Sequence, residues 1–231
     1  MNRIARTLPL ALLALAFALV GRSNAFGQTA EKSYSGFHIS AMGFQNAFAG
    51  HFDGDHFFES GGALYIVPKL ATSLGYGVGF GVRRGEMDAD FYYGQSTHDY
   101  TFPLWDNGRA KFSFVGFDYK FFLIPKGIIQ PFVGMEFAFT WLKVEKGSIM
   151  ETAPFRTADN TFSGLTIGAG GGFAVYPIPA VGLFGMAVFS WETFGNMKGV
   201  GGDRMKLDKL DSLNFNLRFG VTIRFLKSIG D

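Results

Sequence analysis

The segment at residues 213–225 alternates apolar and polar side chains without interruption, and this pattern limits what the chain can fold into. The odd positions are Leu213, Phe215, Leu217, Phe219, Val221, Ile223 and Phe225, against Asn214, Asn216, Arg218, Gly220, Thr222 and Arg224 at the even ones. A period of two belongs to a β-strand, because a helix would scatter the apolar residues around its circumference. The segment is therefore a two-faced strand, longer than the about 9 to 11 residues that a tilted strand needs to cross a bilayer.

Similar stretches recur and predict eight strands, at residues 35–46, 58–67, 74–95, 111–124, 130–143, 163–176, 181–193 and 212–225. Proline-containing segments follow three of them, at residues 66–69, 123–126 and 176–179. Proline stops a strand ladder from continuing, so these are interpreted as short turns on one side. The longer connections, at residues 47–57, 96–110, 144–162 and 194–211, would lie on the other side. The predicted fold class is all-β: an eight-stranded antiparallel up-and-down transmembrane β-barrel.

The apolar face of these strands carries too much volume to fill the inside of a small barrel. Bulky residues occupy it almost throughout, and glycine is frequent on the opposite face, as expected for a chain with 28 Phe and 32 Gly. The interior of an eight-stranded barrel is only just wide enough for side chains to fill it. We therefore expect the apolar face to contact lipid. A soluble ligand-binding barrel with its apolar face inward is the alternative.

Charged residues within the strands then have to face the lumen, because an Arg or Lys facing lipid costs about 2 to 4 kcal/mol near the membrane midplane. This predicts a polar lumen network made of Arg83, Asp118, Lys120, Glu136 and Arg218, in which Lys120 lies near Glu136. Buried charges are tolerated when they are paired, so the network is expected to close the barrel. Residues 181–193 carry bulky side chains at both parities, and their register stays open.

Residues 1–25 carry the features of a secretory signal peptide, and residues 26–231 are predicted to form the barrel domain. Arg3 and Arg6 precede an apolar run at residues 8–20, and the run ends near the small residues Ser23 and Ala25. A second candidate cleavage site ends at Ala30. The apolar run is shorter than the roughly 20 residues that span a membrane as a helix. The chain has no cysteine, so an exported form would be held together without disulfides.

The export signal, the eight alternating strands, the proline-marked turns and the ending Thr222-Ile223-Arg224-Phe225 together resemble the opacity-type and OmpA-transmembrane-domain family of small outer-membrane barrels. The resemblance implies a location in the bacterial outer membrane, with outer-membrane lipid and lipopolysaccharide as neighbours. It also implies the barrel-assembly machinery as a partner, since that machinery reads an aromatic residue at the end of the last strand. The chain departs from that pattern because residues 226–231 follow Phe225.

Several groups of side chains could suggest chemistry. Residues 51–56 hold two His and two Asp at a spacing from which metal ligands can converge, but Asp and Gly are also frequent in turns. His38 and Ser40 share the inward face of the first strand, as a base and a nucleophile would in an outer-membrane lipid-modifying enzyme. The sequence places no acidic residue beside them.

Residues 96–100 include Ser, His and Asp and are interpreted as a solvated loop tip. The mixed charges of residues 198–211 are interpreted as a solvated surface or a partner-contacting surface.

We therefore expect no catalytic residue, no cofactor and no metal. A net charge of +2 without a basic run also argues against nucleic-acid binding. The expected function is a structural or surface-interaction barrel whose outer loops meet host molecules, neighbouring proteins or lipopolysaccharide. An outer-membrane lipid-modifying enzyme and a narrow channel are the alternatives.

Overall fold

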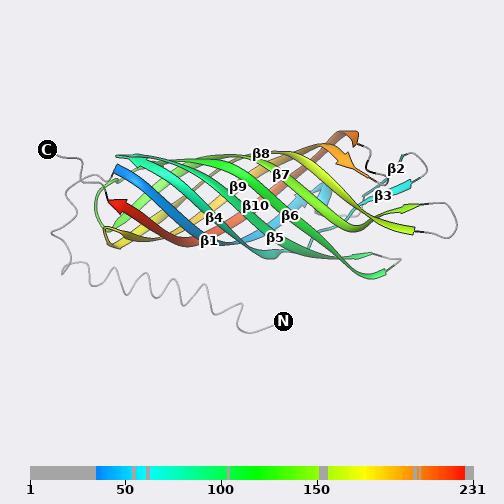
Figure 1. Ribbon diagram of the computed structural model, residues 1–231, viewed down its shortest axis with the longest axis horizontal. Helices are drawn as coiled ribbons and strands as arrows, with labels where there is room; N and C mark the ends of the chain where they lie inside the picture. The colour runs from blue at the N-terminus through cyan, green and yellow to red at the C-terminus, as the bar shows by residue number, and fades with distance from the viewer. Residues whose placement is uncertain are drawn as a thin grey trace.

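The computed structural model describes residues 35–53, 56–60, 63–102, 105–150, 156–199, 202 and 204–226, and these form a closed antiparallel β-barrel (Figure 1). Its strands are β1 (Ser35–Gly50), β4 (Ser73–Arg84), β5 (Met87–Phe102), β6 (Trp105–Phe122), β7 (Ile129–Met150), β8 (Arg156–Ile178), β9 (Val181–Lys198) and β10 (Arg204–Leu226). Each strand pairs with the next, and β10 pairs with β1. The predicted eight-stranded barrel is confirmed. The predicted signal peptide at 1–25 and the tail at 227–231 lie outside the described residues.

The outside of the barrel is apolar over one continuous belt. In β10 the odd residues of 213–225 are all exposed, whereas the even residues face the lumen and are mostly buried. Phe139 in β7 is 62% exposed and Phe189 in β9 is 68% exposed, values that a soluble barrel could not sustain over so wide a surface. The structure also settles the register of β9, since Phe189 and Trp191 point outward while Met186 and Val188 are buried. No helix among the described residues is long and apolar enough to cross a membrane.

Two of the three predicted short turns are correct, and one is wrong. The turns between β6 and β7 and between β8 and β9 lie where Pro125 and Pro179 indicate. The first short turn, however, is at Gly85–Glu86, inside the segment predicted as a single strand at 74–95. Gly85 adopts a φ of 64°, a left-handed conformation that glycine tolerates at little cost. The prolyl segment at 66–69 lies at the opposite end of the barrel.

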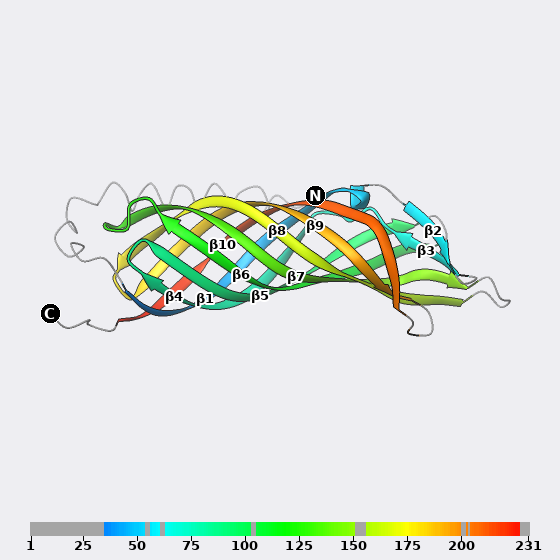
Figure 2. The same ribbon diagram turned by 90° about the horizontal axis from the view of Figure 1, so that it is seen from above.

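The connection between β1 and β4 folds back onto the mouth of the barrel. It contains the 3-10 helix η2 (His51–Asp53) and the strands β2 (His56–Ser60) and β3 (Ala63–Val67), which were predicted as one barrel strand. β3 instead pairs with the far end of β7 through Ala63 and Met150, outside the barrel wall proper. Figures 1 and 2 show β2 and β3 at the end of the barrel opposite the start of β1 and the end of β10. Because the three short turns lie at the end where β1 begins and β10 ends, we refer to that end as periplasmic and to the other as outer.

The strands extend far beyond the lipid belt on the outer side. β7 has 22 residues and β8 and β10 have 23 each, about twice the length that crossing a bilayer requires. Most of residues 96–102, 105–110, 144–150, 156–162 and 204–211, which were predicted as connections, therefore belong to strands.

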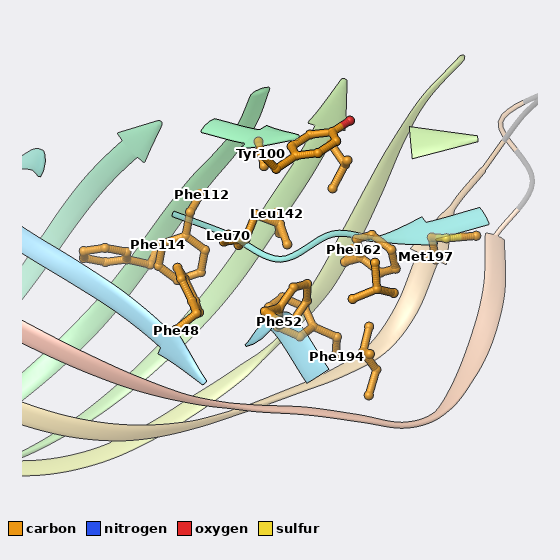
Figure 3. Close-up of a cluster of buried hydrophobic side chains, with 14 of the residues drawn as sticks. Phe48, Phe52, Leu70, Tyr100, Phe112, Phe114, Leu142, Phe162, Phe194 and Met197 are labelled. Atoms are coloured by element: carbon orange, nitrogen blue, oxygen red, sulfur yellow. The ribbon is translucent and has the colours of Figure 1, made fainter. Parts of the chain in front are cut away.

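The interior of this outer half is filled by aromatic and aliphatic side chains. Phe48, Phe52, Phe112, Phe162 and Phe194 pack against one another there, with Phe52 and Phe194 ring centroids 5.4 Å apart (Figure 3). The prediction of a bulky outward face was made for the membrane-spanning segments, and in this outer half the bulky side chains point inward. Alternate residues of each strand still point inward here, but the interior that they line is apolar.

Candidate functional site in the barrel lumen

The centre of the lumen is organised around Arg218. Its guanidinium donates to Asp118 Oδ2 at 3.1 Å and to Glu136 Oε2, and all three side chains are buried. Tyr92 donates to Glu136 Oε2 at 2.9 Å, and Ser190 donates to Glu136 Oε1 at 2.6 Å. The carboxylate of Glu136 is thus held by three donors from β5, β9 and β10. Such an arrangement keeps a charge stable away from water.

Lys120 does not pair with Glu136, and this predicted contact is wrong. Its ammonium group binds Asp90 Oδ2, while Glu136 lies opposite Asp118 in the register of β6 and β7. The physical reason is the unrecognised turn at Gly85. Reading 74–95 as one strand placed Asp88 and Asp90 at the parity of the lipid-facing Val78 and Phe80. With the turn in place, the parity inverts and both aspartates enter the lumen beside Lys120.

Arg83 lies at the periplasmic end of the lumen, directly opposite Asp88 in the register of β4 and β5. Its Nη1 donates to Gln130 Oε1 at 2.7 Å, and its Nε donates to the carbonyl oxygen of Gly85 at 2.9 Å. The guanidinium carbon lies 3.6 Å from the centroid of the Phe122 ring. The lumen residues predicted from the sequence therefore occupy three positions: one around Arg218, one around Lys120 and one at the Arg83 turn.

His38 has acidic neighbours that the sequence did not reveal. Its Nε2 lies 2.7 Å from Asp90 Oδ1 and 3.5 Å from Asp88 Oδ1. Ser40 and His38 line one small cavity in the lumen. A nucleophile–base pair needs one imidazole nitrogen for the serine and the other for the carboxylate. Here both carboxylates meet the same nitrogen, so the arrangement is not that of a catalytic triad.

Ser96 and His98 are not at a solvated loop tip as predicted, but buried inside the outer half of β5. His98 Nδ1 donates to the carbonyl oxygen of Ala71 at 2.8 Å, which leaves Nε2 to accept from Ser96 Oγ at 2.9 Å. Asn46 extends this chain by donating to Ser96 at 3.2 Å. Burial lowers the pKa of His98 below its usual range. This network ties the connection between β1 and β4 to the barrel wall.

The remaining sequence candidates show no converged site among the residues that can be described. His51 Nδ1 contacts the backbone of Asp211, at 2.7 Å from its carbonyl oxygen. Residues 54–55 and the side chains of 53 and 56 lie outside the description, so the suggested metal ligands there are not placed. In the segment 198–211, Lys198, Arg204 and Lys206 are exposed on strands.

The lumen leaves little free space around these groups. A cavity of about 20 Å³ is bounded by His38, Asp88, Asp90 and Lys120, and another of about 10 Å³ lies near Glu192. The first is large enough for about one water molecule.

Comparison with solved structures shows the fold. Neisserial surface protein A is similar over 83% of this chain and 98% of its own, with 14% identity and a TM-score of 0.54. Ail of Yersinia pestis, solved in complex with the heparin analogue sucrose octasulfate, covers 83% of this chain and 99% of its own at 10% identity and a TM-score of 0.49. OprG from Pseudomonas aeruginosa covers 84% and 98% at 10% identity and a TM-score of 0.47. No family model matches the chain, and no curated protein matches it significantly. The chain has the fold of a small bacterial outer-membrane barrel.

Proposed function

We propose that this protein is a closed outer-membrane barrel whose extended outer half is a contact surface, and that its first partner is the phosphate layer of lipopolysaccharide. The observation that carries the proposal is the recurrence of like charges opposite each other on neighbouring strands of the outer half, once just outside the lipid belt and once at the tip of the β9–β10 hairpin. Lys111 on β6 lies directly opposite Lys143 on β7, and Lys198 on β9 lies directly opposite Arg204 on β10. All four are exposed.

Like charges directly opposite each other on neighbouring strands destabilise a sheet, so their recurrence calls for an anion between them. Asp159 binds Lys143 at 2.8 Å and offsets part of that charge. Lys143 lies two residues beyond Trp141, an aromatic residue of the kind that marks the membrane interface. Phosphate groups of the outer leaflet lie at that depth and can bridge two cationic side chains.

A closed lumen is the second part of the proposal. The groups around Arg218, Lys120 and Arg83 fill the membrane-spanning half, and the aromatic cluster of Figure 3 fills the outer half. A barrel packed in this way is suited to a role carried out on its outside. Neither a channel nor a lipid-modifying enzyme is favoured by any arrangement in the described residues.

The test of the contact surface is lipopolysaccharide binding by the purified mature barrel in detergent. The double variant Lys111→Gln, Lys143→Gln should bind about 2 kcal/mol more weakly, or roughly thirtyfold, at about 1 kcal/mol for each lysine near an anionic surface. Lys126→Gln, in the turn at the other end of the barrel, is the matched control and should bind like the parent. Dephosphorylated lipid A should show no difference between parent and double variant. Equal affinity of the double variant for intact lipopolysaccharide would rule the surface out.

The test of closure is separate. In planar bilayers the purified protein should give little or no steady conductance. A large stable open channel would favour the channel function over the contact surface. Mass spectra of lipid A from cells with and without His38→Ala should be identical, since a lipid-modifying enzyme would leave a difference.

A further inference from the structure

Three buried groups of metal-ligand type converge near the periplasmic end of the lumen. His38 Nε2 and one oxygen each from Asp88 and Asp90 all lie within 4.8 Å of one another, and all three residues are buried. The histidine is on β1 and the two aspartates are on β5. β4 lies between these strands, so His38 meets Asp88 and Asp90 across an intervening strand and not within one local turn.

The strand between His38 and Asp90 carries a glycine where their side chains meet, and this leaves room for them. Gly81 on β4 is the register partner of both His38 and Asp90. A Cβ atom at this position would collide with Asp90 Oδ1 and would approach His38 Nε2 to 2.6 Å. Any residue other than glycine would therefore push the histidine and the aspartate apart.

Asp88 supplies an independent sign that a ligand belongs here. Its Oδ1 is buried and accepts no hydrogen bond, although it points towards His38 at 3.5 Å. Asp90 is already balanced by Lys120, and Asp118 and Glu136 share Arg218. A buried carboxylate oxygen without a donor is costly, and a cation is the ligand that would satisfy it.

We propose that His38, Asp88 and Asp90 bind a divalent transition-metal cation, for which Zn²⁺ is the probe. One imidazole nitrogen with two carboxylate oxygens suits zinc and its neighbours better than Mg²⁺ or Ca²⁺, which prefer all-oxygen sites. Ligands at about 2.0 to 2.2 Å from a tetrahedral zinc lie about 3.3 to 3.5 Å apart. The His38–Asp88 separation already has that value. The 2.7 Å His38–Asp90 hydrogen bond would open when Nε2 binds the metal, and its proton would move to Nδ1 or be released to water.

The surroundings complete the coordination. The adjoining cavity of about 20 Å³ has room for one water as a fourth ligand. Lys120 holds Asp90 through Oδ2 and leaves Oδ1 for the metal, so it acts as a positioning residue. The bound cation would link β1 to β5 across β4 and would stabilise the periplasmic end of the barrel.

The experiment uses the untagged mature chain, refolded in detergent with and without Zn²⁺, with folding verified by heat-modifiable migration on a gel. Elemental analysis after dialysis should give one zinc per chain, and competition with a chelating dye should give its affinity. His38→Ala and Asp88→Asn should each weaken zinc binding by on the order of 100-fold or more, since even outer-shell partners cost 10- to 100-fold. Ser40→Ala, which changes the same cavity without removing a ligand, should bind zinc like the parent.

Asp88→Asn also gives a readout that does not depend on affinity. Without metal it removes an unsatisfied buried charge, so its melting temperature should equal or exceed that of the parent. With saturating Zn²⁺ the order should reverse, because zinc stabilises the parent alone. The proposal is overturned if the parent retains no zinc. It is also overturned if zinc binding survives in both ligand variants, or if it is lost in His51→Ala instead.

Discussion

Replacing Glu136 by alanine should strongly destabilise the barrel. The carboxylate accepts from Arg218, Tyr92 and Ser190, and all of these groups are buried. Removing it leaves a buried guanidinium with Asp118 as its remaining carboxylate partner, at 3.1 Å. Breaking one side of a buried ion pair costs about 3 to 5 kcal/mol. Because Asp118 remains, we expect a value of about 3 kcal/mol.

The assay is reversible urea unfolding in lipid vesicles, followed by the fluorescence of the tryptophans. Asp118→Asn is the matched control, and it should cost clearly less because Asp118 has a single donor, Arg218, and its Oδ1 is already without a partner. The pairing itself is tested by double-mutant cycles. Glu136→Ala with Arg218→Met should be less destabilising than the sum of the single changes by more than about 1 kcal/mol.

The companion cycle separates the observed pairing from the one expected on sequence grounds. Glu136→Ala with Lys120→Met should be additive within about 0.5 kcal/mol, since Lys120 binds Asp90. Strong coupling between Glu136 and Lys120, together with additivity between Glu136 and Arg218, would refute the arrangement of the lumen described above.

Three further outcomes follow from the same structure. Leu217→Arg, on the lipid face, should impair insertion by about 2 to 4 kcal/mol, whereas Asn216→Ser in the lumen should have a smaller effect. Equal effects of the two substitutions in a vesicle-insertion assay would mean that the register of β10 is wrong. Phe52→Ala should cost about 3 to 5 kcal/mol of packing in the outer cluster and expose the β1–β4 connection to protease, while a parent-like digestion pattern would contradict that packing. The lowered pKa of His98 means that neutral histidine is favoured in the fold, so stability is full above the ordinary value of 6.5 and falls as the pH drops below it. The protection factor of the Ala71 amide against hydrogen exchange, which corrects for the intrinsic pH dependence of exchange, should therefore fall as the pH drops from about 7.5 to about 5.5, about one unit on either side of that value. His98→Asn should remove this dependence.

The alternation of side chains predicted the fold because the wall of a membrane barrel is defined mainly by which residues face lipid and which face the lumen. A strict period of two fixes which residues face lipid, and β10 has the predicted register from Leu213 to Phe225. Proline and glycine then mark where the ladder stops. The turn at Gly85 was also readable in principle. The outward apolar residues are even up to Val82 and odd from Met87 onward, and a change of parity within one predicted strand requires a turn or a bulge.

The pairing of lumen charges was less accessible. It depends on which strands are neighbours and on their relative stagger, and one missed turn moved Asp88 and Asp90 to the wrong face. The metal-type cluster could not be found for the same reason, because His38 and Asp90 are 52 residues apart and meet only across β4. The folding-back of residues 51–72 rests on long-range packing of Phe52 and Leu70, which no local pattern encodes.

The outer parts of the strands escaped prediction for a different physical reason, which β7 shows within one continuous strand. From Val133 to Trp141 the odd residues are apolar and face lipid, while Glu136 and Thr140 face the lumen. Immediately beyond Trp141, Leu142 and Val144 are apolar and buried, and Lys143 is exposed. The register of β7 with β6 and β8 is continuous through Val144, so what changes at this point is the surroundings of the wall. Within the membrane the outside is lipid and the inside is polar, whereas beyond it the outside is water and the inside must supply the apolar core. A search for one repeating pattern therefore ends each strand where the pattern inverts, and in β7 that inversion, between Trp141 and Lys143, marks the outer boundary of the membrane.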